Sequence, residues 1–159
     1  MAESRILAAS QEGAYVLRLE GDVRLTLCTT IDDYIQRMLA DPQFVSVWVD
    51  LTAAEGMDST TLGILAKLAL KVRKQYGFRP AAYCCNASIV RLLESMGFQQ
   101  LFELREDICM SDNCTEIPQV EGTEDVLRHK VIEAHRVLMG LSDENRDRFR
   151  DLMAALECG

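Results

Sequence analysis

The sequence lacks the features that mark membrane, secreted and nucleic-acid-binding proteins. No apolar run approaches 18 residues and no cationic leader precedes an apolar segment, so we expect neither a membrane span nor a secretory signal. Acidic residues outnumber basic ones by 25 to 17, and the resulting net charge of −8 does not suit the neutralisation of nucleic-acid phosphates. We therefore expect a cytoplasmic protein that binds other proteins, without nucleic-acid binding or membrane insertion.

The residues that most catalytic and metal sites need are also scarce. The six cysteines form no Cys-x-x-Cys pair, and no histidine accompanies them at zinc spacing. His129 and His135, the two histidines, are six residues apart, a spacing that does not place two imidazoles on one helical face. No Gly-x-Ser-x-Gly motif is present either. The prediction is a non-enzymatic protein with no catalytic residue, no metal and no cofactor.

Hydrophobic patterning predicts strands that alternate with helices. Residues 6–10 and 14–20 are typical of an antiparallel hairpin, because the second segment alternates apolar and polar residues and a glycine-containing turn joins the two. The expected elements that follow are a helix at 29–39 capped by Thr29 or Thr30, a strand at 45–51, a helix at 60–75, a strand at 79–85, a helix at 88–96 and a strand at 100–105. This order predicts an α/β fold with a mixed, mostly parallel sheet of about five strands, packed by helices.

The central stretch of the chain combines a strand with a helix start. Residues 45–51 form a β-branched and aromatic run, typical of a strand buried on both faces, and a short turn follows at 52–57. Asp58 and Ser59 then offer two N-cap side chains for the helix at 60–75. The first amides of a helix lack internal partners and favour a capping oxygen or a phosphate, so these residues are either caps alone or a functional site.

The helix at 60–75 has an apolar and a polar side. Ile64 falls on the polar side, one turn from Ser59, where it is either an isolated exposed apolar residue or a partner contact. The residues expected to face the core are Leu62, Leu65, Ala66, Ala69, Val72 and Tyr76, and those expected to face water are Lys67, Lys71, Lys74 and Gln75.

The run Met57-Asp58-Ser59-Thr60-Thr61-Leu62-Gly63 resembles the signature of the STAS domain, found in bacterial anti-sigma factor antagonists and in the tails of sulphate transporters. The resemblance extends from about residue 5 to residue 105. It implies that Ser59 matches the serine that a partner kinase phosphorylates, with Thr60 as the reserve candidate. Thr61 stands where the family often has glycine, a departure that bears on recognition by the kinase.

The resemblance further implies an anti-sigma factor antagonist that acts by partner switching. Its expected partners are an anti-sigma factor that is also a serine kinase and a metal-dependent serine phosphatase. The expected docking surface comprises Asp58, Ser59, Thr60, Thr61 and Ile64. Phosphorylation would add about −1.5 to −2 charges there and release the partner. The alternative is an accessory subunit or regulator of a membrane transporter or of another signalling pathway.

The end of the chain differs in composition from the rest. We expect the STAS-like domain at residues 1–106, an acidic linker at 107–122 and a helical hairpin at 123–159, whose first helix is capped near Thr123. Each hairpin helix carries an apolar stripe that the pair cannot bury alone. The hairpin is therefore expected to dock on its own domain, and the alternatives are homodimerisation and partner binding.

Overall fold

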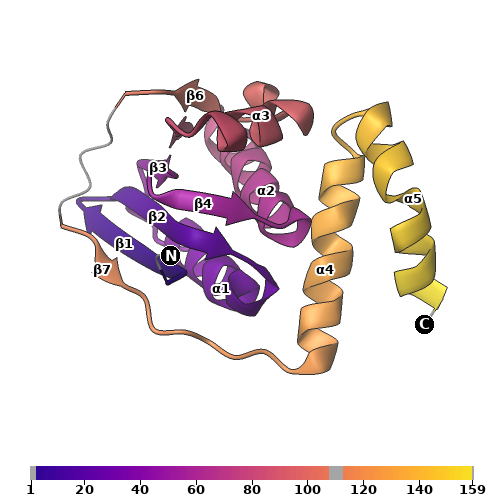
Figure 1. Ribbon diagram of the computed structural model, residues 1–159. Helices are drawn as coiled ribbons and strands as arrows, with labels where there is room; N and C mark the ends of the chain where they lie inside the picture. Colours follow the sequence, from indigo (N-terminus) through magenta and orange to yellow (C-terminus); the bar gives the residue numbers. More distant parts are fainter. Residues whose placement is uncertain (1–2, 108–112, 159) are drawn as a thin grey trace.

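A mixed sheet, helices packed on one of its faces, and a helical hairpin beside those helices make up the molecule (Figure 1). The computed structural model describes residues 3–107 and 113–158. Its elements are β1 Arg5–Gln11, β2 Ala14–Val23, η1 Leu25–Leu27, α1 Cys28–Leu39, β3 Ser46–Asp50, β4 Ala54–Met57, α2 Ser59–Tyr76, β5 Ala81–Tyr83, α3 Ala87–Ser95, η2 Phe98–Gln100, β6 Glu103–Arg105, β7 Thr115–Glu116, α4 Glu124–Met139 and α5 Asp143–Cys158.

The sheet has the expected mixed topology. β1 and β2 form the antiparallel hairpin, and β2, β3, β5 and β6 run parallel in the order β6-β5-β3-β2-β1-β7. β4 pairs with the end of β2, past a register shift at Gly21, whose φ of 78° favours glycine. The α/β prediction is confirmed, but the described residues contain two more strands than expected. The turn expected at 52–57 contains β4, which the sequence concealed because it is short and has no β-branched residue.

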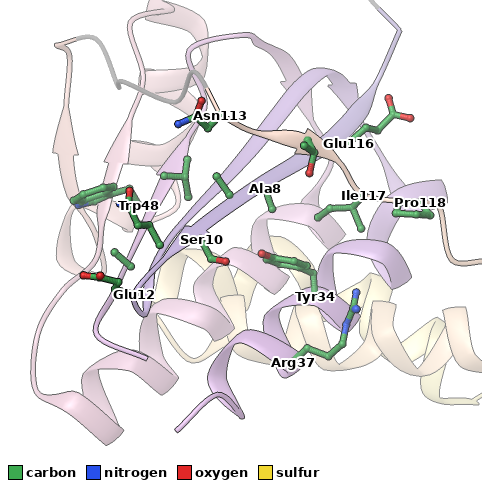
Figure 2. Close-up of a pocket in the computed structure, with 15 residues that line it drawn as sticks. Ala8, Ser10, Glu12, Tyr34, Arg37, Trp48, Asn113, Glu116, Ile117 and Pro118 are labelled. Atoms are coloured by element: carbon green, nitrogen blue, oxygen red, sulfur yellow. The ribbon is translucent and has the colours of Figure 1, made fainter. Parts of the chain in front are cut away.

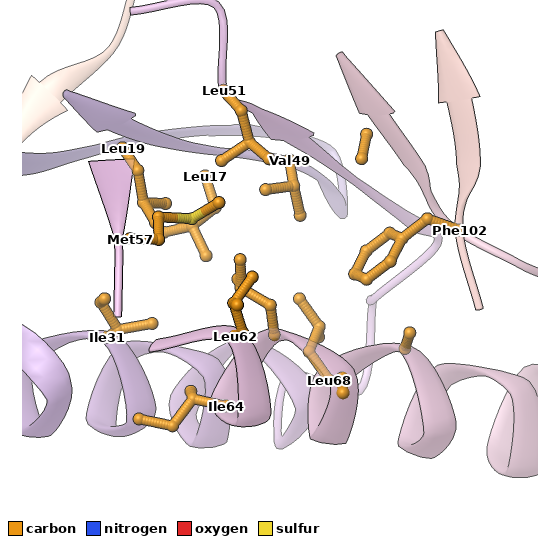
Figure 3. Packing of buried hydrophobic residues seen from close by; sticks show 14 of the residues in the cluster. Leu17, Leu19, Ile31, Val49, Leu51, Met57, Leu62, Ile64, Leu68 and Phe102 are labelled. Carbon is orange, nitrogen blue, oxygen red and sulfur yellow. The ribbon is translucent and has the colours of Figure 1, made fainter. Parts of the chain in front are cut away.

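The main core lies between the sheet and the helices (Figure 3). Leu17 and Val49 point from the sheet toward Leu62 and Leu68 of α2, and all four are at most 1% exposed. The prediction that the strand at 45–51 is buried on both faces is wrong, because Trp48 on its other face is 40% exposed. β3 is therefore a central strand whose second face is exposed at Trp48 and covered at Asp50.

The helical hairpin packs against the domain rather than standing apart from it. α4 lies beside α2, and a Cβ placed on Gly63 would come within 2.6 Å of the carbonyl carbon of Ala134. The side-chain amide of Asn145, at the start of α5, donates to the main-chain carbonyls of Leu138 at 2.9 Å and Met96 at 3.0 Å. The hairpin thus docks on its own domain, the first of the fates considered for it. As expected, Thr123 caps α4, accepting a hydrogen bond from the amide of Val126.

The described part of the expected linker also follows the domain. β7 pairs antiparallel with β1, and the amide of Val120 donates to the Thr30 hydroxyl at 2.9 Å. Thr30 therefore holds the linker and does not cap α1, and the predicted cap is wrong. The N-cap position is Leu27, which has no side-chain cap, and residues 28–39 still form the helix.

The close contact at Gly63 gives a test of how tightly α4 is seated. Gly63→Ala should lower the free energy of unfolding by roughly 1–2 kcal/mol, because moving backbone costs more than the helix propensity gained. Gly140→Ala is the matched control, since φ is −74° there and the nearest atom lies 3.4 Å from the new Cβ. Urea unfolding of both variants measures the difference. Equal stability of the two variants would contradict a tight contact.

Candidate functional site

Asp58 fixes the start of α2. One carboxylate oxygen accepts hydrogen bonds from the Thr61 amide at 2.9 Å and the Thr61 hydroxyl at 2.8 Å. The other accepts from the Leu25 amide at 2.7 Å, in the turn after β2. Asp58 is thus the N-cap, and the expectation that Ser59 shares this role is wrong. The carboxylate joins two separate segments of chain and holds the residue after it in place.

Ser59 is the first residue of α2, and its hydroxyl contacts a histidine from the appended hairpin. Ser59 Oγ lies 2.7 Å from Nε2 of His135, and Nδ1 of the same ring lies 2.6 Å from the Val131 carbonyl. Because a carbonyl only accepts, Nδ1 carries the proton of the neutral ring and Ser59 donates to Nε2. His135 is 2% exposed and meets the Phe149 ring edge-on at 5.0 Å.

Sequence reasoning missed this pairing. The serine and the histidine are 76 residues apart, and no local pattern links them. The contact gives Ser59 a basic neighbour, but the ring is enclosed and its far nitrogen faces a main-chain carbonyl instead of a carboxylate. It therefore differs from the Ser-His-acid arrangement of hydrolases.

The other expected docking residues are covered in this conformation. Thr60 is 5%, Thr61 0% and Ile64 3% exposed, whereas Asp58 and Ser59 remain partly exposed. The Thr61 hydroxyl lies 3.2 Å from the Val23 carbonyl and belongs to the interior. Ile64 points away from the sheet in Figure 3 and is nevertheless buried. Thr60, Thr61 and Ile64 are therefore covered in this conformation, and their role in docking a partner stays a prediction.

The helical wheel of α2 correctly placed Leu62, Leu65, Ala66, Ala69 and Val72 in the core, but it missed that α4 covers a second side of the helix. Ser59, Gly63 and Lys67 are spaced four residues apart, on one face, and contact His135, Ala134 and Glu133 of α4 in turn. Conversely, Tyr76, expected to face the core, is 41% exposed. The sequence of α2 alone did not reveal which polar residues a later helix would cover.

A buried carboxylate ties α1, α2 and α4 together. Asp32, with a side chain 3% exposed, accepts from the ammonium groups of Lys67 at 3.2 Å and Lys130 at 2.6 Å. Lys67 also pairs with Glu133, so its expected place on a solvated face is wrong. Burial alone would raise the pKa of Asp32, but the hydrogen bond from Lys130 and the charge of Lys67 outweigh it and hold this pKa below its ordinary value.

Other features lie away from Ser59. His129 is exposed, its Nδ1 3.0 Å from the Asp125 carbonyl, and the described residues contain no group of three histidine, cysteine, aspartate or glutamate side chains placed to hold a metal. A cavity of about 760 Å³ lies between Tyr34 and Arg37 of α1 and the segment around β1 and β7 (Figure 2). None of the five expected site residues lines it.

In the part of the chain described, no helix is both long and apolar enough to cross a membrane.

The fold and the first turn of α2 define a STAS domain, and comparison with known families agrees. The STAS domain family matches residues 5–109, more than half of the chain, so the chain belongs to this family. The matched residues end before α4, so the hairpin that covers Ser59 lies outside them.

Two solved structures illustrate the likeness of fold. An anti-sigma factor antagonist from Mycobacterium paratuberculosis is 23% identical with a TM-score of 0.57, covering 67% of this chain and 88% of that one. The anti-sigma factor antagonist SpoIIAA in its unphosphorylated form is 14% identical with a TM-score of 0.52, covering 64% of this chain and 87% of that one. No curated protein matches the sequence.

The buried Asp32 cluster predicts a pH-dependent contribution to stability. Because the pKa of Asp32 is lower in the folded protein than its ordinary 3.8, the contribution is complete above that value and is lost as pH falls through the folded-state pKa. Asp32→Asn should lower the free energy of unfolding by about 1.5–3 kcal/mol at neutral pH, and the difference from wild type should shrink as the pH falls below about 3.8.

Urea unfolding across this pH range measures the effect. Asp33→Asn, at the adjacent exposed position, is the matched control and should change stability by less than about 0.5 kcal/mol. A difference between wild type and Asp32→Asn that stays constant down to about pH 3 contradicts the assignment to Asp32.

Proposed function

We propose that the protein is an anti-sigma factor antagonist that acts by partner switching, with Ser59 as the phosphorylated residue. The observation that carries this proposal is the position of Ser59: it follows the N-cap Asp58 directly and begins α2 within the STAS signature. Two structurally similar proteins are named anti-sigma factor antagonists, which supports the same function. In this proposal the protein works in the cytoplasm.

Burial favours Ser59 over Thr60 as the acceptor. A kinase must reach the hydroxyl, and Ser59 is partly exposed whereas Thr60 is 5% exposed. Thr61 is fully buried, and its hydroxyl is occupied by Asp58 and by the Val23 carbonyl. Ser59 is thus the hydroxyl of this turn that needs the least rearrangement, and Thr60 remains the reserve.

A phosphate at Ser59 would act electrostatically on a bound partner. It adds about −1.5 to −2 charges at neutral pH, which the amides at the start of α2 tolerate. The carboxylate of Asp58 and an acidic partner surface repel this added negative charge. Two unit charges about 6 Å apart at an effective dielectric near 20 repel by about 3 kcal/mol, on the order of a hundredfold in affinity. The switch therefore needs no refolding of the sheet.

The proposed partners follow from this cycle. An anti-sigma factor with serine kinase activity binds the unphosphorylated form and modifies it, and a metal-dependent serine phosphatase restores it. Co-purification tests the partner class directly. Recovery of a transporter ATPase or permease subunit in place of a kinase would favour the alternative role of STAS domains in transport.

Phosphate mapping tests the acceptor. Incubation of the full chain with the anti-sigma factor kinase and ATP should place one phosphate on Ser59, and Ser59→Ala should remove it because the hydroxyl is gone. Ser88→Ala is the matched control, since Ser88 is an exposed serine in the first turn of another helix, α3. It should leave labelling unchanged. Undiminished labelling of Ser59→Ala rules out Ser59, and mass spectrometry then shows whether Thr60 carries the phosphate.

A further inference from the structure

The face of α2 that begins at Ser59 is occupied in the structure by part of the same chain. Along this face the Ser59 hydroxyl contacts His135, Gly63 meets the backbone of Ala134, and Lys67 pairs with Glu133. Figure 1 shows α4 standing between the domain and α5. A protein that docks on this face of α2 therefore competes with α4 for the same area.

The contact at Ser59 also restricts modification. The Ser59 oxygen lies 2.7 Å from His135 Nε2, a distance that leaves no room for a phosphoryl group between the two atoms. The ring is 2% exposed and packed edge-on against Phe149 of α5, so it has little space to move while the hairpin is seated. The hydroxyl and the hairpin must separate before a kinase can use this oxygen.

The connection of the hairpin permits such a separation. Residues 117–123 join β7 to α4 without a helix or strand, so the hairpin stays tethered when it lifts. Most of the buried apolar cluster lies between the sheet and α1, α2 and α3, so the domain keeps this part of its core when the hairpin lifts. The buried apolar side chains that the hairpin contributes are Ala134, Leu138, Phe149 and Met153.

Polar contacts supply much of the remaining attachment. Lys130 of α4 reaches the buried Asp32 at 2.6 Å, and Asn145 reaches the Met96 carbonyl at 3.0 Å. The Asp32 pair joins opposite charges across the gap between α1 and α4, so it selects this seating of the hairpin over others. The closed form is therefore held by these polar contacts together with the buried apolar side chains of the hairpin, and both are given up when it lifts.

We propose that the α4–α5 hairpin is an intramolecular competitor that closes the α2 face, so that partner docking and modification of Ser59 both require it to lift. The identity of the partner rests on the proposed function, whereas the closure itself does not. Because only the open form binds, the apparent dissociation constant equals the intrinsic one divided by the open fraction. The hairpin thereby sets how much active antagonist a given amount of protein supplies.

Substitutions in the hairpin test the proposal and leave the STAS docking face unchanged. Ala134→Glu in the full chain places a charge against the backbone at Gly63 and should lift the hairpin. Ala154→Glu is the matched control, because it makes the same change at an exposed position of α5. Hydrogen exchange of the α2 amides should accelerate at least about tenfold in Ala134→Glu alone, with β2 and β3 as protected as in wild type.

A partner-free probe measures the exposed face. A synthetic peptide of residues 123–141, which contains α4, should bind Ala134→Glu and should not bind wild type or Ala154→Glu. Absence of peptide binding to a folded Ala134→Glu variant overturns the closure. If Ala134→Glu loses the protection of β2 and β3, Asn145→Ala serves instead, and it should give a smaller change in the same direction because it removes the bonds to Met96 and Leu138.

Binding to the anti-sigma factor separates this inference from the proposed function. Ala134→Glu should bind at least about tenfold more tightly than Ala154→Glu and should be phosphorylated faster. If hydrogen exchange shows that the hairpin has lifted in Ala134→Glu, and binding is still equal or weaker, the competitor role is overturned and the proposed function stands. If no variant binds or is labelled, the proposed function fails, and the peptide experiment still decides whether the hairpin closes the face.

Discussion

The carboxylate of Asp58 is the constraint on which the site depends. It accepts hydrogen bonds from the Thr61 amide in the first turn of α2 and from the Leu25 amide in the turn after β2, so the helix start, the end of β2 and the end of β4 are fixed together. These contacts fix the position of Ser59, the residue that follows Asp58. With Asp58 already serving as cap, the Ser59 hydroxyl is free for a contact outside its own helix, and a charge added there acts on whatever covers the helix start.

The accessibility of the site also depends on α4, which covers the start of α2. In an isolated STAS domain the face with Ser59, Gly63 and Lys67 would be solvated, and here α4 lies on it. The absence of a side chain at Gly63 allows the two backbones to approach closely, and Asp32 draws Lys130 of α4 toward the domain. Ser59, which the sequence placed in the expected docking surface, thus belongs to an internal interface of this chain together with Gly63 and Lys67.

The Asp58 cap and the α4 cover together explain how a domain with a shared fold can be controlled differently in this chain. The part of the chain that matches the family supplies all of the sheet except β7, most of the core and the start of α2, and function resides in the site built on them. The hairpin outside this match changes the accessibility of the site without changing the residues within it. In the proposed closure, the added segment alters the fraction of molecules able to bind and leaves the binding residues unaltered.

The sequence by itself determined the α/β order, the hairpin of β1 and β2, the start of α2 at Asp58 and Ser59, and the amphipathic helices after residue 123, because these follow from local periodicity, turn residues and caps. Only the tertiary structure decided that β4 joins the sheet, that Ile64 and Lys67 are covered, and that His135 meets Ser59. Each of these depends on segments far apart in the chain, and the polarity of one helix does not specify which other helix will pack against it.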